Sequence, residues 1–233
     1  MLRKNHTKQL LEILKDKEPP DFHCLLILKG FRLNRMKVKK YIEDSFLENI
    51  KVEQSTLKVC WPKIIEASHA VIDCYYKRGG SVFTFGNGGS ATDAEHVAEE
   101  LLNRFKNYRI PISAYALTSQ PAILTGIAND FGFEKIFSRQ LEALATPKDL
   151  IMAFSTSGNS KNVINGVSLV KSRGIKTIGL TGKNGGELAK LVDIAIKVPS
   201  DDVARVQEVH TIIGHIICGI VDETLFGETG LEW

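Results

Sequence analysis

The stretch Val82-Phe-Thr-Phe-Gly-Asn-Gly-Gly-Ser90 joins a short apolar strand pattern to a glycine-rich loop, and the helical pattern Ala91–Phe105 follows directly. Glycine lets a backbone adopt left-handed angles and approach a ligand closely. The helix would supply free N–H groups and a partial positive charge, and Ser90 could cap it or donate its hydroxyl to a ligand. The loop lacks the spacing of a dinucleotide fingerprint and the lysine of a Walker loop, so a simple tight turn remains an alternative.

Four more short apolar runs alternate with longer amphipathic ones and predict strands at Ile112–Leu117, Asp149–Phe154, Lys176–Leu180 and Asp193–Val198. Strands with apolar side chains on both faces are typical of a parallel sheet covered by helices on both sides. Helical patterns lie between and after these runs at Ala122–Ile127, Phe133–Ala145, Asn159–Arg173, Gly186–Leu191 and about Ala204 to Leu225. The alternation predicts an α/β fold, a doubly wound parallel sheet of about five strands flanked by helices, preceded by N-terminal helices at about 37–59 and 62–78.

Residues 1–35 differ from the rest of the chain, because Pro19-Pro20 interrupts any helix and no sustained period is present. We interpret them as an extension, either poorly ordered or the product of a mis-called start with Met36 as the true one. Residues 36–233 are predicted to form a single domain.

The chain has 233 residues, of which 43% are apolar and 24% are charged, as in ordinary globular proteins. Its formal net charge of +3 comes from residues 1–35, where eight basic and four acidic residues give +4, so residues 36–233 carry −1. This distribution argues against nucleic-acid binding. No run reaches the roughly 18–20 apolar residues of a membrane span. Four scattered cysteines without a Cys-x-x-Cys pair favour reduced thiols in a cytoplasmic protein over a disulfide framework.

A second loop, Ser155-Thr-Ser-Gly-Asn-Ser160, also leads from a predicted strand into a helix. A capping side chain satisfies only one or two N–H groups, so four hydroxyl groups in six residues exceed what capping requires. The remaining hydroxyls and the backbone donors suit the oxygens of a phosphate monoester, although a doubly capped helix start is the alternative. The turn Leu180-Thr-Gly-Lys-Asn-Gly-Gly186 follows the next strand and is interpreted as structural.

Two pairs of polar side chains are candidates for the chemistry of the site. His96 and Glu100 are four residues apart, so they lie on one face of the helix behind the glycine-rich loop. Gln207 and His215 are eight residues apart on the final helix and could still address one pocket. Taken alone, the first pair is typical of a surface ion pair and His215 of a buried core histidine. Combined with two phosphate-type loops, they indicate a sugar-phosphate site with acid–base partners.

From about Val38 to Phe226 the chain resembles the sugar isomerase (SIS) family. The matching segments keep the family's order and spacing, and they are Gly86–Leu101, Ala128–Phe133, Ser155–Ser160, Leu180–Lys183 and Arg205–His210. The resemblance implies an aldose–ketose isomerase that converts sedoheptulose 7-phosphate to D-glycero-D-manno-heptose 7-phosphate through an enediol, for heptose and surface-polysaccharide synthesis. It also implies a homotetramer with sites between subunits.

The resemblance further implies roles for individual positions. The substrate phosphate would be held by Ser155, Thr156, Ser157 and Ser160. The sugar would be lined by Asn87, Gly88, Gly89, Ser90, Asn129, Asp130 and Gln207. Glu100 would be the base and His215 its acid partner. A zinc ion would be gathered by His96, Glu100, Gln207 and His215, although glutamine is an unusual zinc ligand and the bare side chains could suffice. Ala204 stands where some relatives carry an acidic residue, so any substrate contact from that side chain is lost.

A second hypothesis is a binding protein without catalysis. One relative in the same family associates with the bacterial replication initiator, and the ending Val221–Phe226 leans towards it. That relative lacks the catalytic glutamate and the late histidine, whereas this chain keeps Glu100 and His215. The sequence therefore favours the isomerase, and a sugar-phosphate sensor with a dormant site is a weaker third hypothesis.

Overall fold

The computed structural model describes residues 35–227. Contacts divide the chain into Met1–Phe46 and Leu47–Trp233, and the sheet and every site discussed below belong to the second unit. The predicted extension lies outside the described residues except for Arg35, so its interpretation stays a prediction.

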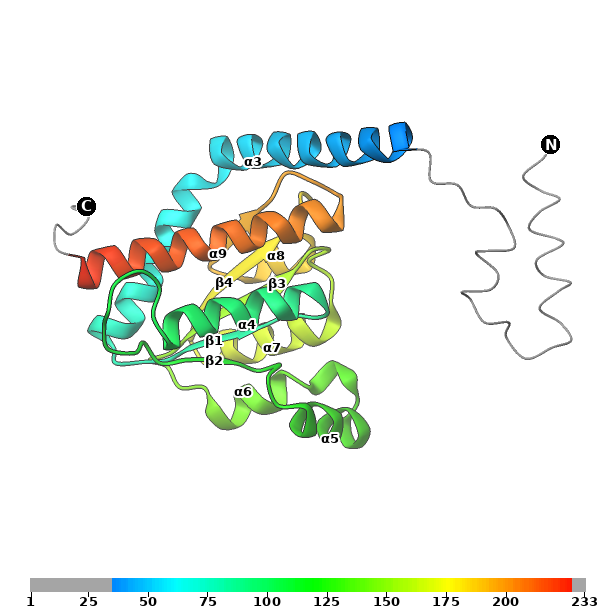
Figure 1. Cartoon of the computed structure of the whole chain (residues 1–233). Coiled ribbons are helices and arrows are strands. Elements are labelled where there is room, and N and C mark those ends of the chain that lie inside the picture. The colour runs from blue at the N-terminus through cyan, green and yellow to red at the C-terminus, as the bar shows by residue number, and fades with distance from the viewer. Residues whose placement is uncertain (1–34, 228–233) are drawn as a thin grey trace, which may run out of the picture. The chain divides into compact units, whose positions relative to one another are not determined.

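The described strands form one five-stranded parallel sheet in the order β2-β1-β3-β4-β5 (Figure 1). Their bounds are β1 (Val82–Phe85), β2 (Ala114–Ala116), β3 (Leu150–Ser155), β4 (Lys176–Thr181) and β5 (Ile194–Lys197). The predicted fold class is confirmed, and each strand begins and ends within about two residues of its predicted position. Because the chain moves from β1 outward to β2 and then returns to β3, the strand order reverses beside β1, where sheets of this kind bind ligands.

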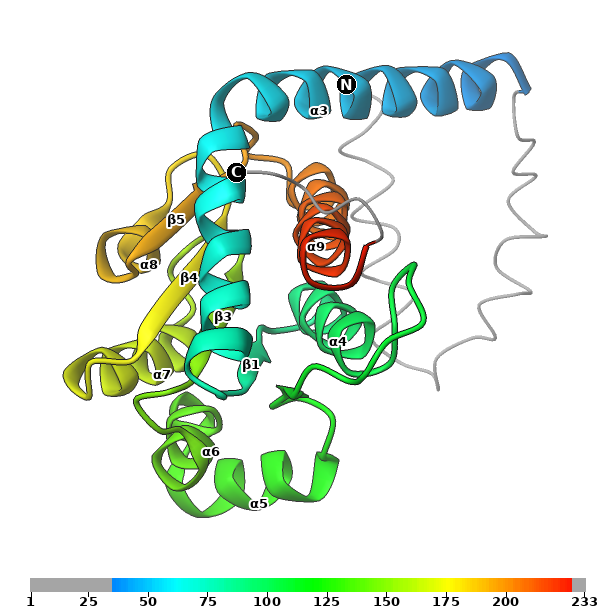
Figure 2. The ribbon, with the colours of Figure 1, turned by 90° about the vertical axis from the view of Figure 1, so that its left-hand side faces the viewer.

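The described helices are α3 (Arg35–Ile72), α4 (Gly89–Leu102), α5 (Pro121–Phe131), α6 (Ser138–Leu144), α7 (Lys161–Ser172), α8 (Gly186–Leu191) and α9 (Val203–Phe226). The prediction of two helices before the sheet was wrong. A single helix, α3, contains Pro62 and continues into a π-helical turn, Asp73–Lys77. Proline removes one backbone hydrogen bond and kinks a helix without necessarily ending it, and Figure 2 shows α3 bent. The predicted helix Phe133–Ala145 is likewise divided, into a 3-10 turn at Phe133–Lys135 and α6.

Helices cover both faces of the sheet, as the strand composition predicts (Figure 2). Along β3, Leu150, Met152 and Phe154 pack with α3, α4 and α9. The alternate residues Ile151 and Ala153 pack with α6, α7 and α8 on the other face. The two apolar layers fix α4 and α9 on the same side of the sheet, and these helices carry the side chains of the candidate site.

The helix α9 is long and apolar enough to span a membrane by length and composition alone. In the structure it is a core helix, because residues such as Val209, Ile213 and Ile217 are fully buried against the sheet and its neighbours. Packing within the domain therefore accounts for the apolar residues on the buried face of α9.

The described cysteines Cys60, Cys74 and Cys218 are free and buried, and Cys24 lies outside the described residues. Burial raises the pKa of the Cys74 thiol to about 11 and that of Cys218 to about 12. Both thiols are thus protonated and inert at neutral pH, which agrees with the expected reduced state.

His210 of α9 makes the stability of the fold sensitive to acid. The side chain is fully buried, Nε2 lies 3.3 Å from the Thr181 carbonyl oxygen, and Nδ1 has no partner. Burial lowers its pKa to about 4, and the Thr181 carbonyl opposes this only in part. Because the unfolded chain binds the proton near pH 6.5, this stability is complete above that pH and is lost as the pH falls towards 4.

The expected loss from this group is roughly 3 kcal/mol of unfolding free energy between pH 7 and pH 4. Urea unfolding of the wild type and of His210→Gln at pH 7.5 and 4.5 measures it. The variant should show a smaller decline than the wild type over this interval. An equal decline in both proteins would contradict the assignment of acid sensitivity to His210.

Candidate active site

The glycine-rich loop turns from β1 into α4 at a glycine in a left-handed conformation. Gly88 has φ of 54° and occupies the N-cap position, with no side-chain cap bond. Ser90 lies buried inside the first turn, and its backbone N–H donates to the Asn87 carbonyl at 3.0 Å. The suggestion that Ser90 caps the helix was therefore wrong, because the helix begins one residue earlier, at Gly89.

A pair of asparagine side chains joins the two loops at the carboxyl ends of β1 and β3. Asn87 Nδ2 donates to Asn162 Oδ1 at 2.8 Å, and Asn162 Nδ2 donates back to Asn87 Oδ1 at 2.8 Å. This reciprocal amide pair holds the glycine-rich loop beside the serine loop. Sequence reasoning missed Asn162, which carries no spacing signal of its own.

The hydroxyl groups of the serine loop are not consumed by helix capping. Ser160 is the N-cap of α7 without a side-chain cap bond, and Ser155 Oγ donates to Ser160 Oγ at 3.1 Å. Ser157 Oγ accepts the Asn159 N–H at 3.1 Å, a local contact within the loop. The alternative of a doubly capped helix start is thus not supported.

A cavity of about 290 Å³ opens beside this loop, and its lining includes Thr156, Ser157, Lys183 and Asp201. Lys183 Nζ lies 3.7 Å from Asp201 Oδ2, and both side chains are largely exposed. Sequence reasoning assigned no role to Lys183. It would place a cation beside any anion held by the serine loop, where phosphate oxygens favour one.

The turn that follows β4, Leu180–Gly186, packs against the serine loop, as its structural interpretation predicts. The Gly182 N–H donates to the Thr156 carbonyl at 2.9 Å. Gly158 has φ of 66°, and a Cβ atom there would lie 2.0 Å from the Gly185 carbonyl oxygen. Glycine is therefore required at 158 for both its backbone angle and the close approach of this turn.

His96 and Glu100 of α4 meet His215 of α9 in one cluster. His215 Nε2 lies 3.2 Å from His96 Nε2, and Glu100 Oε1 lies 3.4 Å from His96 Nε2 and 3.8 Å from His215 Nε2. The Glu100 side chain is 18% exposed, and the two imidazoles are about half-buried. The helices can approach this closely because α9 has Gly214 at the crossing, where a Cβ atom would lie 2.7 Å from Val97 Cγ2.

The three donor atoms suit a zinc ion. Ligand atoms about 2.0–2.1 Å from a tetrahedral zinc are roughly 3.3–3.4 Å apart, close to the spacings of this triangle. Two imidazoles and one carboxylate are also an ordinary ligand set for a catalytic zinc, which keeps a further position open. The residues present therefore fit the implied metal.

Asp93 borders the cluster and was missed by sequence reasoning. It accepts a hydrogen bond from Thr211 Oγ1 at 2.7 Å, while its other carboxylate oxygen is buried without a partner. Burial raises the pKa of Asp93, although the Thr211 hydrogen bond and the nearby His96 oppose the shift. Helical spacing could have predicted its position, because Asp93 lies three residues before His96 and seven before Glu100, and these spacings place all three side chains on one helix face.

Other predicted site residues lie elsewhere in the chain. Gln207 packs against Gly89 at the start of α4, eight residues or about 12 Å along α9 from His215, so the structure gathers three of the four expected metal ligands. Asn129 and Asp130 lie exposed on α5, where Asn129 Nδ2 donates to Asp130 Oδ1 at 2.8 Å. Among the described residues, no hydrogen bond joins them to the loops or the cluster.

A separate cavity lies away from this chemistry. Its volume is about 760 Å³, and it borders the edge strand β2 with a mostly apolar lining that includes Tyr115 and Ile123. The His96, Glu100 and His215 cluster does not line it. We place the candidate active site at the cluster and the two loops, because they hold the groups that can bind phosphate and transfer protons.

Comparison with known proteins gives a consistent result. The SIS domain family model matches residues 45–182. A phosphoheptose isomerase of Geotalea daltonii is 47% identical over 187 residues, which cover 80% of this chain and 97% of that protein. A phosphoheptose isomerase of Sulfurimonas denitrificans is 42% identical over 193 residues, which cover 82% of this chain and 98% of that protein.

Two solved structures are also similar. A phosphoheptose isomerase from Francisella tularensis superposes with a TM-score of 0.77 at 36% identity, covering 80% of this chain and 98% of its own. The phosphoheptose isomerase of Neisseria gonorrhoeae gives a TM-score of 0.76 at 34% identity, covering 80% of this chain and 99% of its own.

Proposed function

The chain belongs to the SIS domain family, among the phosphoheptose isomerases, and we propose that it converts sedoheptulose 7-phosphate to D-glycero-D-manno-heptose 7-phosphate. It is an aldose–ketose isomerase, and its pathway would be heptose synthesis for surface polysaccharide. The observation that carries the proposal is the His96–Glu100–His215 cluster. It places a carboxylate, which can accept a proton, beside two imidazoles in a chain that is similar to phosphoheptose isomerases.

The reaction moves one proton between neighbouring carbons of the open-chain sugar. The C2 carbonyl of the ketose acidifies the C1 protons, so a base can remove one of them and leave an enediol. Return of a proton to C2, with the oxygen protons exchanged, gives the aldose. No electron leaves the sugar, so no redox cofactor is required.

We assign the base to Glu100. Its carboxylate is partly shielded from water and lies within 4 Å of both imidazoles. His215 would donate a proton to, or hydrogen-bond, the oxygen on which negative charge develops. Alternatively, a zinc ion held by His96, Glu100 and His215 would supply a Lewis acid at that oxygen in place of the proton from His215.

The serine loop would hold the far end of the substrate. The start of α7 is surrounded by the hydroxyl groups of Ser155, Thr156, Ser157 and Ser160. Asn87 of the glycine-rich loop lies beside them, hydrogen-bonded to Asn162 of α7. Binding energy from the phosphate, which does not react, would position C1 and C2 for proton transfer. Gly88, Gly89, Ser90, Asn129, Asp130 and Gln207 remain proposed sugar contacts on the strength of the family resemblance.

The geometry supports a site completed by a second copy. Gly89 at the loop and Glu100 at the cluster are eleven residues apart, or about 16 Å along the axis of α4. Within one chain the loop and the cluster therefore lie well apart. In a complete site, helices α4 and α9 of another subunit would bring their cluster next to the loops of this one. Gln207 of one subunit could then join the metal ligands of the other.

Exposed apolar side chains on α3 also favour assembly. Leu47, Ile50, Leu57 and Trp61 are each about half exposed or more, and they follow one another at intervals of three, seven and four residues. Such a stripe is typical of a helix that packs on another helix. The stripe supports association of several copies, and on the strength of the family resemblance we propose a homotetramer, located in the cytoplasm. Sedimentation velocity would report it as four times the mass of one chain.

The alternative of a non-catalytic protein bound to the replication initiator gains no support. The similar proteins described above are named as isomerases, and Glu100 and His215 are both kept. We propose no nucleic-acid or membrane partner.

Proton NMR of the purified protein with sedoheptulose 7-phosphate tests the proposed function. The expected result is a new aldose anomeric signal that grows with time and reaches equilibrium. Absence of this signal, with and without added zinc, would refute the isomerase and favour the binding protein.

A further inference from the structure

A buried arginine and a buried aspartate join the ends of the two helices that carry the cluster. Arg109 Nε donates to Asp222 Oδ1 at 2.7 Å, and the two side chains are 1% and 2% exposed. Arg109 lies in the segment after α4, and Asp222 lies near the end of α9. Neither side chain can reach solvent or substrate, so neither is a catalytic residue.

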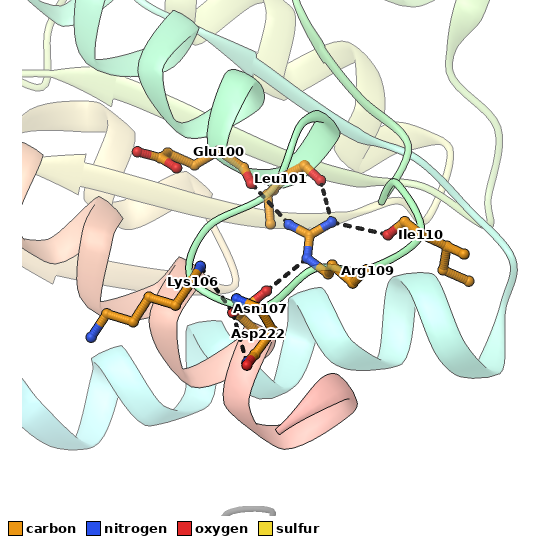
Figure 3. Close-up of polar contacts among 7 residues, drawn as sticks. All are labelled: Glu100, Leu101, Lys106, Asn107, Arg109, Ile110 and Asp222. Atoms are coloured by element: carbon orange, nitrogen blue, oxygen red, sulfur yellow. Dashed lines mark hydrogen bonds and ion pairs between the residues drawn. The ribbon is translucent and has the colours of Figure 1, made fainter. Parts of the chain in front are cut away.

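Arg109 is bonded to the last turn of α4 on its other side (Figure 3). Its Nη2 donates to the Glu100 carbonyl oxygen at 2.9 Å, and Nη1 donates to the Leu101 carbonyl at 2.9 Å and the Ile110 carbonyl at 3.1 Å. The last carbonyls of a helix have no partner within the helix. The planar guanidinium supplies these partners in a fixed geometry that a lysine ammonium does not reproduce.

Asp222 fixes the rest of the segment. Its Oδ2 accepts the Lys106 N–H at 3.1 Å, the Asn107 N–H at 2.8 Å and Asn107 Nδ2 at 3.0 Å. Burial alone would raise the pKa of Asp222, but the hydrogen bonds from Asn107, Arg109 and Lys106 outweigh it and lower the pKa. The carboxylate is therefore charged and saturated with donors at neutral pH.

The same segment touches His215. The Phe105 ring centroid lies 5.9 Å from that of His215, and a Cβ atom at Gly219 would lie 3.2 Å from Phe105 Cε1. Asp222 follows His215 by seven residues, two turns along the same face of α9. The arginine is thus bonded to the residue that provides the base and to the helix that provides the acid.

We propose that Arg109 and Asp222 are positioning residues for the active site, which set the spacing of Glu100 and His215 by joining the end of α4 to α9. The inference rests on the proposed function for its kinetic test. It assigns no contact with substrate to either residue.

Arg109→Lys and Asp222→Asn test the proposal, because each keeps size and polarity but breaks the geometry. We expect kcat to fall about 30-fold or more, since an error near 1 Å in a reacting group can cost about 100-fold. KM should stay within about threefold, because the serine loop lies elsewhere. The double variant should lose little more than either single one, since both remove the same device.

Asp193→Asn is the matched control. Asp193 accepts three hydrogen bonds, one fewer than Asp222, from Lys171 Nζ, the Thr177 N–H and Thr177 Oγ1, in an ion pair remote from the cluster. It should lower the melting temperature as the test variants do and leave kcat within about twofold. A kcat loss in this control equal to that of Arg109→Lys would mean that the effect follows stability alone, which overturns the proposal.

Metal binding gives a second readout that does not depend on turnover. Metal-free protein titrated with Co²⁺ and followed by visible absorption should bind about 10- to 100-fold more weakly in Arg109→Lys than in the wild type or Asp193→Asn. If the wild type binds cobalt but does not isomerise the sugar, the proposed function fails, and the comparison of cobalt affinities still tests the positioning role.

The positioning role would be refuted by unchanged kcat and unchanged cobalt affinity in both test variants. It would also be refuted by a wild type that shows neither activity nor cobalt binding.

Discussion

Replacing Glu100 with glutamine is expected to abolish isomerisation while the fold is kept. The amide has nearly the same shape as the carboxylate but cannot accept the C1 proton, so kcat should fall by a factor of about 10³ or more. Removal of the charge should change stability little, because the side chain is neither fully buried nor part of a strong ion pair. Proton NMR measures turnover, and circular dichroism with thermal melting measures the fold.

Glu99→Gln is the matched control for this variant. Glu99 precedes Glu100 in the same turn of α4, is exposed, and accepts a hydrogen bond from Asn103 Nδ2 at 3.1 Å. One residue along a helix turns the side chain by about 100°, so Glu99 cannot replace Glu100 in the cluster. The control should keep kcat within about threefold. Activity of Glu100→Gln within tenfold of the wild type would remove Glu100 as the base.

Most of the fold could be predicted because its signals are local. The strands are short apolar runs with both faces buried, and this pattern has few explanations other than a parallel sheet between helical layers. The error at α3 has an equally local cause. Pro62 is a helix-breaking signal, but the residues that follow it, including Ile64, Ala67 and Val71, pack into the core and keep the segment helical.

The site was predictable only in part, because it depends on contacts between distant segments. The four-residue spacing placed His96 beside Glu100, but nothing local brings His215 to them. That contact arises where Gly214 lets α9 approach Val97 of α4. Helical spacing also allowed Gln207 to share a pocket with His215. Within one chain the packing of α9 sets Gln207 against Gly89, and its role as a ligand stays a proposal.

The supporting residues were missed for the same reason. Arg109 and Asp222 are separated by 113 residues, and their pairing is visible only once both helices are placed. The reciprocal bonds of Asn87 and Asn162 likewise depend on β1 and β3 being neighbours. Arg109, Asp222 and Asn162 support functional segments and carry no substrate-binding motif of their own, so motifs alone do not identify them.

Removal of bound metal is the second change with a large expected effect. The Nε2 atoms of His96 and His215 are 3.2 Å apart, so without a cation one imidazole must donate a hydrogen bond to the other. A zinc ion would satisfy both nitrogens and the Glu100 carboxylate at ordinary ligand spacings. Treatment with a strong chelator should therefore lower turnover by about 100-fold or more, and one equivalent of zinc per cluster should restore it.

Metal content per chain, measured by mass spectrometry, separates this result from indirect chelator effects. His96→Gln and His215→Gln each remove one ligand, so both should lose most of the bound zinc. His210→Gln is the control, because His210 is on α9 like His215 but is buried against the Thr181 carbonyl away from the cluster. Full turnover in protein shown to be free of metal would leave the cluster with side-chain chemistry alone, in which case Glu100 and His215 would have to transfer the proton and stabilise the developing charge without a Lewis acid.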